Sequence, residues 1–217
     1  MTDSLKVLIV GTGNVARALA HRLKETDHVI VMGSRDAARG AEVGGEIGVT
    51  GSASTEHVSD ADIVFIAVPF VSLDETLAAL GPMSGKIVVD CTNPLTDDYM
   101  ALTMGHTTSA GEYCADQLPE ARVVKAFNAI FADVVHNNPA YNTVTPQVFV
   151  AGEDQGAKDT VSDLIHAIGY EPVDCGAMIM ARYLEPLAEL IIQLAYVQGH
   201  GTRITPVIVR EPAAPGE

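Results

Sequence analysis

The first candidate for chemistry is a glycine-rich turn near the start of the chain. Gly11 and Gly13 follow the apolar run Lys6–Val10 in the pattern G-x-G-x-x-A, and a periodic, helix-forming segment comes next. Glycines at this spacing let the backbone approach a pyrophosphate, and the N-terminus of the following helix offers free N–H groups and a positive dipole. The turn therefore predicts a dinucleotide site. The alternative is a domain of the same architecture that keeps the turn for packing alone.

A hydroxyl and a guanidinium, Ser34 and Arg35, stand just after the second predicted strand, His28–Met32. NAD-binding proteins usually carry Asp or Glu there to hold the ribose 2′-hydroxyl. Serine and arginine instead suit a 2′-phosphate, because a guanidinium donates charge-assisted hydrogen bonds to phosphate oxygens. We therefore expect the cofactor to be NADP(H). The alternative for Arg35 is an ordinary solvated arginine.

Groups for acid–base, nucleophilic or metal chemistry are scarce. The sequence shows no catalytic triad and no Tyr-x-x-x-Lys pair, and its three cysteines and seven histidines follow no ligand spacing. We expect no catalytic side chain and no metal site. The expected site works by holding two reactants together, since orientation alone can lower a barrier by up to ~7–11 kcal/mol.

Several side chains have two alternative interpretations, one functional and one structural. Asn93 and Asn128 are candidates for hydrogen bonds to a carboxamide or to an acceptor ring, or for capping local turns. Cys91 is expected as a small buried hydrophobe rather than a neighbour of the nicotinamide. His106 is expected as a solvated loop residue rather than a donor to an acceptor carbonyl.

Strand-like and helix-like segments alternate through the chain. This predicts an α/β fold with a doubly wound parallel sheet, of the Rossmann NAD(P)-binding type, and a small C-terminal helical extension. The further predicted strands are Val49-Thr50, Asp62–Val68, Lys86–Asp90, Arg122–Ala126, Pro146–Val150 and Glu171–Val173. The predicted helices are Asn14–Glu25, Asp36–Gly45, Ser72–Leu80, Ser109–Leu118, Gln155–Ile168 and Met178–Val197. We expect the second helix to be poorly formed because it is rich in glycine.

The chain is expected to divide into three parts. These are a dinucleotide-binding Rossmann domain over residues 1–150, a small C-terminal domain over 151–210 for the acceptor pocket or a dimer contact, and a disordered tail over 211–217. Apolar residues on one stripe of the last helix would pack on the first domain or on a second subunit, since exposed they would drive association. We expect a homodimer with the acceptor pocket near its interface. The stripe is Leu187, Leu190, Ile191, Leu194 and Val197.

The composition fits a globular protein that binds small molecules. Hydrophobic residues make up 47% of the 217, and a formal net charge of −15 argues against nucleic acid or an anionic membrane as partner. No run approaches the ~20 apolar residues that a membrane helix needs. Because the residues before the first strand do not form a signal peptide, we expect a cytoplasmic protein.

Several segments match one family in order and spacing. They are Gly11–Ala16, Gly33–Arg35, Val68–Phe70, Lys86–Leu95, Val123–Asn128, Gly152–Asp154, Gly169-Tyr170 and Pro172–Gly176. Together they resemble the coenzyme F420-dependent NADP oxidoreductases, a family that includes the cytosolic reductase domain of mammalian metalloreductases. The resemblance covers roughly residues 5–197, and at Lys125–Ala132 it is closer to the bacterial and metalloreductase-like branch than to the archaeal enzymes.

The resemblance implies hydride transfer between NADP(H) and a small-molecule redox acceptor, either the deazaflavin coenzyme F420 (8-hydroxy-5-deazaflavin) or a flavin. By position, one group of residues lines the pyrophosphate, a second the 2′-phosphate, a third the path from adenosine to nicotinamide, and a fourth the nicotinamide and acceptor. The groups are Thr12, Gly13, Asn14 and Val15; Ser34 and Arg35; Val68, Pro69 and Phe70; and Asn93, Pro94, Leu95, Ala126, Phe127 and Asn128.

Other functions stay open at this level. The metalloreductase-like branch suggests an NADPH-dependent reductase of FMN or FAD. The lack of acid–base residues is also compatible with a non-catalytic NADP(H) redox sensor. An imine or ketone reductase would need a proton donor such as Tyr113 or His106.

Overall fold

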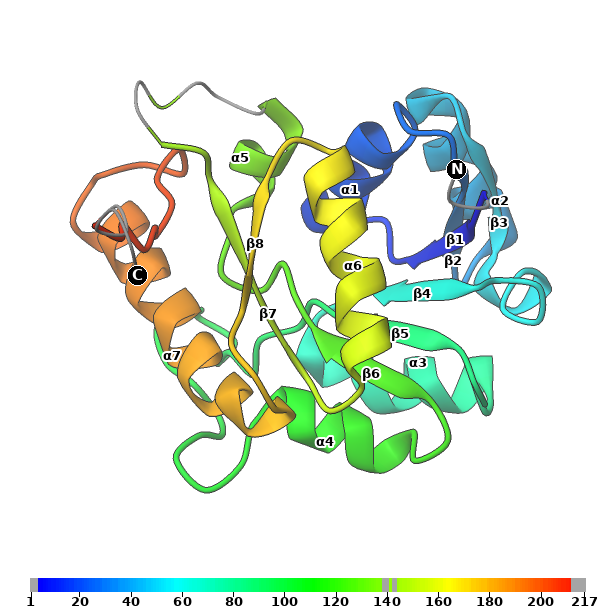
Figure 1. Ribbon diagram of the computed structural model, residues 1–217. Coiled ribbons are helices and arrows are strands. Elements are labelled where there is room, and N and C mark those ends of the chain that lie inside the picture. Colours follow the sequence, from blue (N-terminus) through cyan, green and yellow to red (C-terminus); the bar gives the residue numbers. More distant parts are fainter. Residues whose placement is uncertain (1–3, 138–140, 142–143, 212–217) are drawn as a thin grey trace, which may run out of the picture.

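A single sheet of eight strands runs through the molecule, in the order β3-β2-β1-β4-β5-β6-β7-β8 (Figure 1). The computed structural model describes residues 4–137, 141 and 144–211. The strands are β1 Lys6–Val10, β2 Val29–Ser34, β3 Thr50–Ala53, β4 Ile63–Ile66, β5 Ile87–Asp90, β6 Arg122–Lys125, β7 Gln147–Gly152 and β8 Glu171–Asp174. Strands β1 to β6 are parallel, whereas β7 is antiparallel to β6 and parallel to β8. The predicted doubly wound sheet is confirmed, with its last two strands reversed.

The reversal lies in the connection between β6 and β7, which contains the short helix α5, Ala132–Asn137. β7 starts near the edge of the sheet where β6 ends, and Lys125 pairs with Ala151 in an antiparallel ladder. The sequence analysis missed α5 because six residues are too few to show a helical period.

Helices cover both faces of the sheet. Besides α5 they are α1 Asn14–Leu23, α2 Ala37–Ile47, α3 Leu73–Leu80, α4 Ala110–Gln117, α6 Gln155–Ala167 and α7 Ala181–Ile192. Successive residues of a strand point to opposite faces, so Ile9 of β1 joins a core with α1, α2, α5 and α6, whereas Leu8 joins a core with α3 and α4. α7 packs on β7 at the end of the molecule away from β1 and β2 (Figure 1).

Helix α2 is regular, so the expectation that its glycines would leave it poorly formed is wrong. Asp36 caps its N-terminus by accepting a hydrogen bond from the Arg39 N–H, and Gly48 ends it in the left-handed conformation. A Cβ added to Gly40 would lie 2.1 Å from the Ser52 carbonyl oxygen. The glycines therefore let α2 lie directly against β3.

The C-terminal helix differs from the prediction in shape and in the face it buries. The predicted helix Met178–Val197 consists of a 3-10 turn, Met178–Met180, then α7, then a π-helical turn, Gln193–Val197. Of the predicted stripe Ile191 is buried, whereas Leu190 and Val197 are more than half exposed. Ile191 and Leu187 pack in one cluster with Phe149 of β7. Part of the stripe therefore contacts the first 150 residues, and a second subunit stays a candidate partner for the exposed part.

Three expectations concern the domain boundary, the C-terminal tail and the absence of a membrane helix. The predicted domain boundary after residue 150 falls inside β7, and the division into two domains stays a prediction. The tail predicted as disordered lies outside the described residues from position 212 on. Within the described ranges, no helix has the length and apolarity to cross a membrane.

Candidate functional site

The glycine-rich turn opens into a cavity of about 600 Å³, the glycine-turn pocket. Its walls come from the β1–α1 turn, the end of β2, the start of α2 and helix α3. Seven residues predicted for the cofactor site line it, namely Gly11, Thr12, Gly13, Ser34, Arg35, Val68 and Pro69. The structure thus brings together residues from three separate segments of the chain.

Gly11 and Gly13 are glycines for different structural reasons. Gly11 has φ +128°, and a Cβ there would lie 2.3 Å from the Ala67 carbonyl oxygen. A Cβ on Gly13 would meet no described atom within 4 Å, and no side chain among the described residues caps α1 at this end. Gly11 is therefore required by the fold, whereas the free space over Gly13 fits a pyrophosphate.

The far end of this pocket carries the expected hydroxyl and guanidinium, together with charges that the sequence analysis did not predict. Arg35 is exposed and forms an ion pair with Glu75 of α3 at 2.9 Å. Arg39 also lines the pocket, one helical turn beyond Arg35, and pairs with Glu42 at 2.5 Å. The usable signal for this second guanidinium was the position of Arg39 in the first turn of the helix that follows Arg35.

A bridging pocket of about 260 Å³ continues from there along the sheet edge. It shares Val68 and Pro69 with the glycine-turn pocket, and it shares Cys91 and Asn93 with a third cavity beside α7. Phe70 lines the bridging pocket as well. The three cavities therefore follow one path past the carboxyl ends of β1, β4, β5 and β6, where open α/β sheets bind their ligands.

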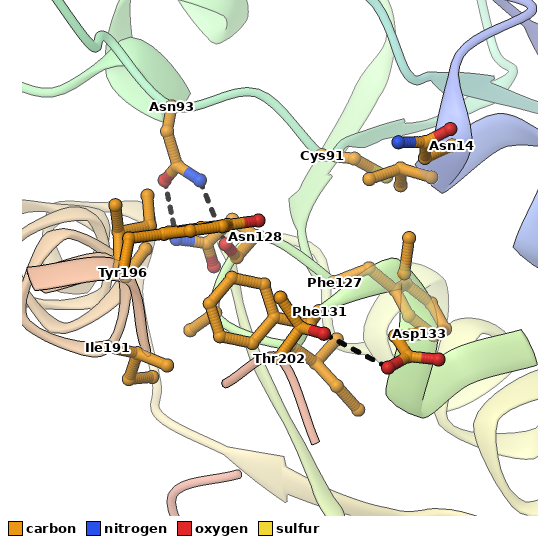
Figure 2. Close-up of a pocket in the computed structure, with 16 residues that line it drawn as sticks. Asn14, Cys91, Asn93, Phe127, Asn128, Phe131, Asp133, Ile191, Tyr196 and Thr202 are labelled. Atoms are coloured by element: carbon orange, nitrogen blue, oxygen red, sulfur yellow. Dashed lines mark hydrogen bonds between the residues drawn. The ribbon is translucent and has the colours of Figure 1, made fainter. Parts of the chain in front are cut away.

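The third cavity, the α7 pocket, has a volume of about 460 Å³, and its walls expose polar and apolar surface in nearly equal parts. Phe131 and Tyr196 meet edge to face there, with ring centroids 6.0 Å apart (Figure 2). Of the described lining residues Asp133 is the charged one, and its carboxylate accepts a hydrogen bond from the Thr202 hydroxyl at 3.0 Å. Such a cavity suits a flat ring that carries polar groups at its edge.

Two asparagines join the turns after β5 and β6 in this pocket (Figure 2). The Asn93 amide donates to the Asn128 carbonyl oxygen at 2.8 Å, and the Asn128 amide donates to Asn93 Oδ1 at 3.0 Å. The Asn128 amide also donates to the Leu184 carbonyl oxygen of α7 at 3.0 Å. Phe127, with φ 61°, makes the turn that brings Asn128 to this position. The structural interpretation therefore accounts for both side-chain N–H groups of Asn128 and for one of Asn93.

A buried ion triad lies beneath these turns. The Lys125 ammonium is 2.8 Å from both the Asp90 and the Glu185 carboxylates and donates to the Thr92 carbonyl oxygen at 2.6 Å. Glu185 also accepts the N–H groups at the start of α4. Burial opposes the charged ammonium, but the two carboxylates outweigh it and raise the pKa of Lys125. The triad thus links β5, β6, α4 and α7. The one indication of it in the sequence was Lys125, a lysine at the end of an apolar strand.

The remaining predicted residues are distributed unevenly. Asn14 and Val15 line the α7 pocket rather than the glycine-turn pocket, and Leu95 lines the bridging pocket. Pro94 and Ala126 are buried and line none of these three cavities.

The candidates for reactive chemistry lie mostly outside these cavities. Cys91 lines the α7 pocket, and burial raises the pKa of its thiol well above the usual range, so it stays protonated. His106 is exposed and lines none of the cavities, and the Tyr113 hydroxyl donates to Asp74 at 2.9 Å. Tyr196, which the sequence analysis did not single out, brings a phenol to the α7 pocket. In the described part of the chain, no three metal-binding side chains gather.

Comparisons with known proteins agree with this geometry. The family model described as NADP oxidoreductase, coenzyme F420-dependent, matches residues 6–94. The F420-dependent NADP reductase of Methanothermobacter thermautotrophicus is 29% identical over 93% of this chain and 95% of its own length. The metalloreductase STEAP3 of Rattus norvegicus is 34% identical over 85% of this chain, and the chain spans 36% of that protein's length.

A solved structure shares the fold over nearly the whole chain. It is a protein from Arthrobacter sp. FB24, proposed to be an F420-dependent NADP reductase, with a TM-score of 0.87 at 29% identity, covering 95% of this chain and 100% of the other. The match to the family model spans the glycine-rich turn, Ser34 and Arg35, and the walls of the bridging pocket as far as Asn93. The chain is therefore similar in sequence and fold to the coenzyme F420-dependent NADP oxidoreductases.

Proposed function

We propose that the protein transfers a hydride between NADP(H) and the deazaflavin coenzyme F420. The observation that carries the proposal is the continuity of the three cavities, which share Val68 and Pro69 at one junction and Cys91 and Asn93 at the other. A dinucleotide whose phosphates lie at the glycine turn can extend through the bridging pocket, so that its nicotinamide meets a ring in the α7 pocket. The F420-dependent relatives support this choice of acceptor.

The glycine-turn pocket would hold the adenosine half of the cofactor. Gly13 and the start of α1 provide space and N–H groups for the pyrophosphate. Ser34, Arg35 and Arg39 provide a hydroxyl and two guanidinium groups for the 2′-phosphate. Arg35 and Arg39 share the pocket with the carboxylates of Asp36 and Glu75, so they provide hydrogen-bond donors for the phosphate rather than a net positive charge.

The α7 pocket would hold the acceptor ring. When bound, the cofactor supplies the hydride, and the side chains of the protein orient the two rings and exclude water. Phe131, Ile191 and Tyr196 form apolar and aromatic walls for this purpose. A pocket of this kind needs no nucleophile, which agrees with a Cys91 thiol that stays protonated.

An NADPH-dependent flavin reductase is the second candidate function. Its support is the identity of 34% to a metalloreductase, and a flavin ring has the same flat shape as a deazaflavin. The described lining of the α7 pocket contains no lysine or arginine, so the phosphate of FMN would have to stay outside it.

Anaerobic rapid mixing tests the proposal. NADPH and protein are mixed with coenzyme F420 or with FMN, and the absorbance of the oxidised acceptor is followed. Turnover with coenzyme F420 alone supports the proposal, and turnover with FMN alone supports the second candidate. NADPH binding without turnover of either would contradict both and favour an NADP(H) sensor.

We also propose that the protein forms a homodimer through α7. Tyr183 and Leu190 are more than half exposed, and Leu187 between them is half-buried. These residues lie four and three positions apart, the spacing of a helix seam that pairs with an identical helix. A solution mass of two chains at micromolar concentration, reduced to one chain by Leu190→Glu, is the expected light-scattering result. A wild-type mass of one chain would contradict the dimer.

A further inference from the structure

One buried ammonium joins the walls of two neighbouring cavities without lining either of them. Lys125 is fully buried and lines none of the three cavities described above. An ammonium has three N–H donors. Those of Lys125 meet three acceptors, namely the Thr92 carbonyl oxygen at 2.6 Å and the carboxylates of Asp90 and Glu185 at 2.8 Å each. The donors are therefore all used, and the ammonium has no capacity left for a ligand.

The contact with Thr92 fixes the wall that the bridging pocket and the α7 pocket share. That wall is the turn after β5, since Cys91 and Asn93 line both cavities and Thr92 lines the bridging pocket. The Thr92 N–H donates to Asp90 Oδ1 at 2.9 Å, and the Thr92 carbonyl oxygen accepts from Lys125. The triad thus holds both polar groups of the Thr92 backbone, so the turn cannot shift without breaking a buried charge-assisted hydrogen bond.

The contact with Glu185 fixes a second wall of the α7 pocket. Glu185 belongs to α7 and lies three and seven positions before Ala188 and Ile192, which line that pocket. Residues at this spacing share one face of a helix. Glu185 also accepts the N–H groups at the start of α4, so α7 is held at this point from two sides. The Lys125 ammonium is therefore attached both to the shared turn and to α7.

We propose that Lys125 is a positioning residue for hydride transfer, because its ammonium sets the separation of the nicotinamide and the acceptor ring. The inference rests on the proposed function, in which the nicotinamide reaches the bridging pocket and the acceptor ring lies in the α7 pocket. Hydride transfer needs the reacting atoms within about 3–3.5 Å of each other, and the walls on the two sides of that gap are joined at this ammonium. Lys125 acts through Thr92 and Glu185 and is not a catalytic residue.

A second link joins the same two walls. Asn93 and Asn128 exchange two hydrogen bonds, and the Asn128 amide donates to the Leu184 carbonyl oxygen of α7. These bonds join neutral groups, whereas every contact of Lys125 carries charge and is at most 2.8 Å long. Charge-assisted hydrogen bonds are about twice as strong as neutral ones, so we assign control of the separation to Lys125. The test must show that the neutral link alone does not keep it.

Two variants remove the ammonium at different cost to folding. Lys125→Met leaves both carboxylates of the triad without their cation. The double variant Lys125→Met with Asp90→Asn leaves the net charge of the triad as it is in the wild type, and its new amide oxygen can still accept the Thr92 N–H. Leu164→Ala is the matched control, because this buried leucine of α6 lines none of the three cavities. Its truncation should lower stability by an amount comparable with the loss in Lys125→Met.

Single-turnover mixing with NADPH measures the rate constant of hydride transfer to coenzyme F420, with FMN as a parallel acceptor. We expect both Lys125 variants to lose about 100-fold in this rate constant, the cost of a misplacement of about one ångström. Their dissociation constants for NADPH should stay near the wild-type value, since the phosphates lie at the other end of the path. Leu164→Ala should keep the wild-type rate constant. A wild-type rate constant in the double variant, or an equal loss in Leu164→Ala, would overturn the inference.

A second measurement needs no turnover. NADP⁺ and 8-hydroxy-5-deazariboflavin are both oxidised and do not react with each other, so the protein can hold the two together. A nuclear Overhauser effect between H4 of the nicotinamide and H5 of the deazaflavin is expected in the wild type and in Leu164→Ala. It should be lost in both Lys125 variants while both ligands stay bound, and an undiminished effect in the double variant would overturn the inference. Its absence in the wild type with both ligands bound would contradict the proposed function, and the inference with it.

Discussion

The glycine-turn pocket and the α7 pocket bind with different parts of the chain. The first presents backbone N–H groups of a contiguous turn and exposed ion pairs, such as Arg35 with Glu75, whose side chains are 72% and 67% exposed. The second is assembled from residues 14 to 202, and behind it lies an ion triad, Lys125 with Asp90 and Glu185, whose side chains are at most 1% exposed.

Because of this difference, substitutions in the two pockets should affect the stability of the fold to different extents. Exposed ion pairs contribute about 0–1 kcal/mol to stability, so the charges of the glycine-turn pocket can change with little effect on the fold. A buried charge left without its partner costs about 3–5 kcal/mol. The α7 pocket is therefore coupled to the stability of the whole sheet, and each region should respond differently to substitution.

The largest effect is expected at the one part of the glycine-turn pocket that packing does constrain. Gly11→Ala would place a Cβ 2.3 Å from the Ala67 carbonyl oxygen at φ +128°, so the turn must move. Since a shift of about one ångström can cost about 100-fold in rate, turnover with NADPH should fall by at least that factor. The measurement is kcat/KM, accompanied by thermal unfolding.

Gly13→Ala is the matched control for the turn. Its added Cβ meets no described atom within 4 Å, so this variant should keep the wild-type melting temperature and lose affinity for NADPH, whose pyrophosphate would occupy that space. If Gly11→Ala melts and turns over like the wild type, packing does not constrain the turn.

The second largest effect is expected in the ion triad. Lys125→Met leaves Asp90 and Glu185 as buried carboxylates without a cation, and should lower the free energy of unfolding by about 3–5 kcal/mol. Urea unfolding measures it. Lys6→Met, which removes the exposed pair with Asp60, should cost less than about 1 kcal/mol. Equal costs for the two variants would contradict the contrast between buried and exposed pairs.

The triad also predicts how stability changes in alkali. The pKa of Lys125 is raised in the folded state, because its two carboxylates outweigh the effect of burial. Its contribution is therefore complete below the unfolded value of about 10.5 and is lost only as the pH rises through the raised value. In the alkaline range wild-type stability should fall toward that of Lys125→Met.

The two regions were also unequally predictable from the sequence. The glycine-turn pocket depends on local patterns: a strand, a G-x-G turn and a serine-arginine pair that each act through adjacent residues. Gly11, Ser34 and Arg35 accordingly line the pocket for which they were predicted. Glu75 escaped prediction because its contact with Arg35 joins α3 to the end of β2, 40 residues apart.

The α7 pocket depends on contacts that no local pattern contains. Glu185 reaches across 74 and 75 positions to the start of α4, and a single glutamate on a helix normally predicts an exposed face. The predicted stripe of α7 overlaps the buried face only at Leu187 and Ile191, because it left out the small residue Ala188, which packs in the same cluster as β7. Burial there is decided by shape against the sheet, which hydrophobicity alone does not encode.

The third largest effect is expected in the glycine-turn pocket, on the preference for NADPH over NADH. Arg35→Ala should weaken NADPH binding about 10- to 100-fold and leave NADH binding nearly unchanged, since charge-assisted hydrogen bonds contribute about 1.5–3 kcal/mol. Because Glu75 already forms an ion pair with the Arg35 guanidinium, the 2′-phosphate must compete with Glu75. We therefore expect the loss of NADPH affinity to lie toward the lower end of this range. Fluorescence titration measures both constants. An equal loss for NADPH and NADH would mean that Arg35 does not bind the 2′-phosphate.

The smallest effect tests whether a partly exposed pair can still couple α7 to the rest of the fold. Arg182 of α7 donates two hydrogen bonds, at 2.8 and 2.7 Å, to Glu112 of α4. These bonds lower the pKa of Glu112, so the stability they provide is present above the unfolded value of about 4.5 and is lost as the pH falls through the folded value. Between pH 7 and pH 3 the wild type should lose about 1–3 °C more melting temperature than Arg182→Met. The exposed Arg210 is the control, because Arg210→Met should follow the wild-type profile. If Arg182→Met also follows the wild-type profile, the Arg182–Glu112 pair does not stabilise the contact between α7 and α4. The buried triad, rather than this pair, would then account for that contact.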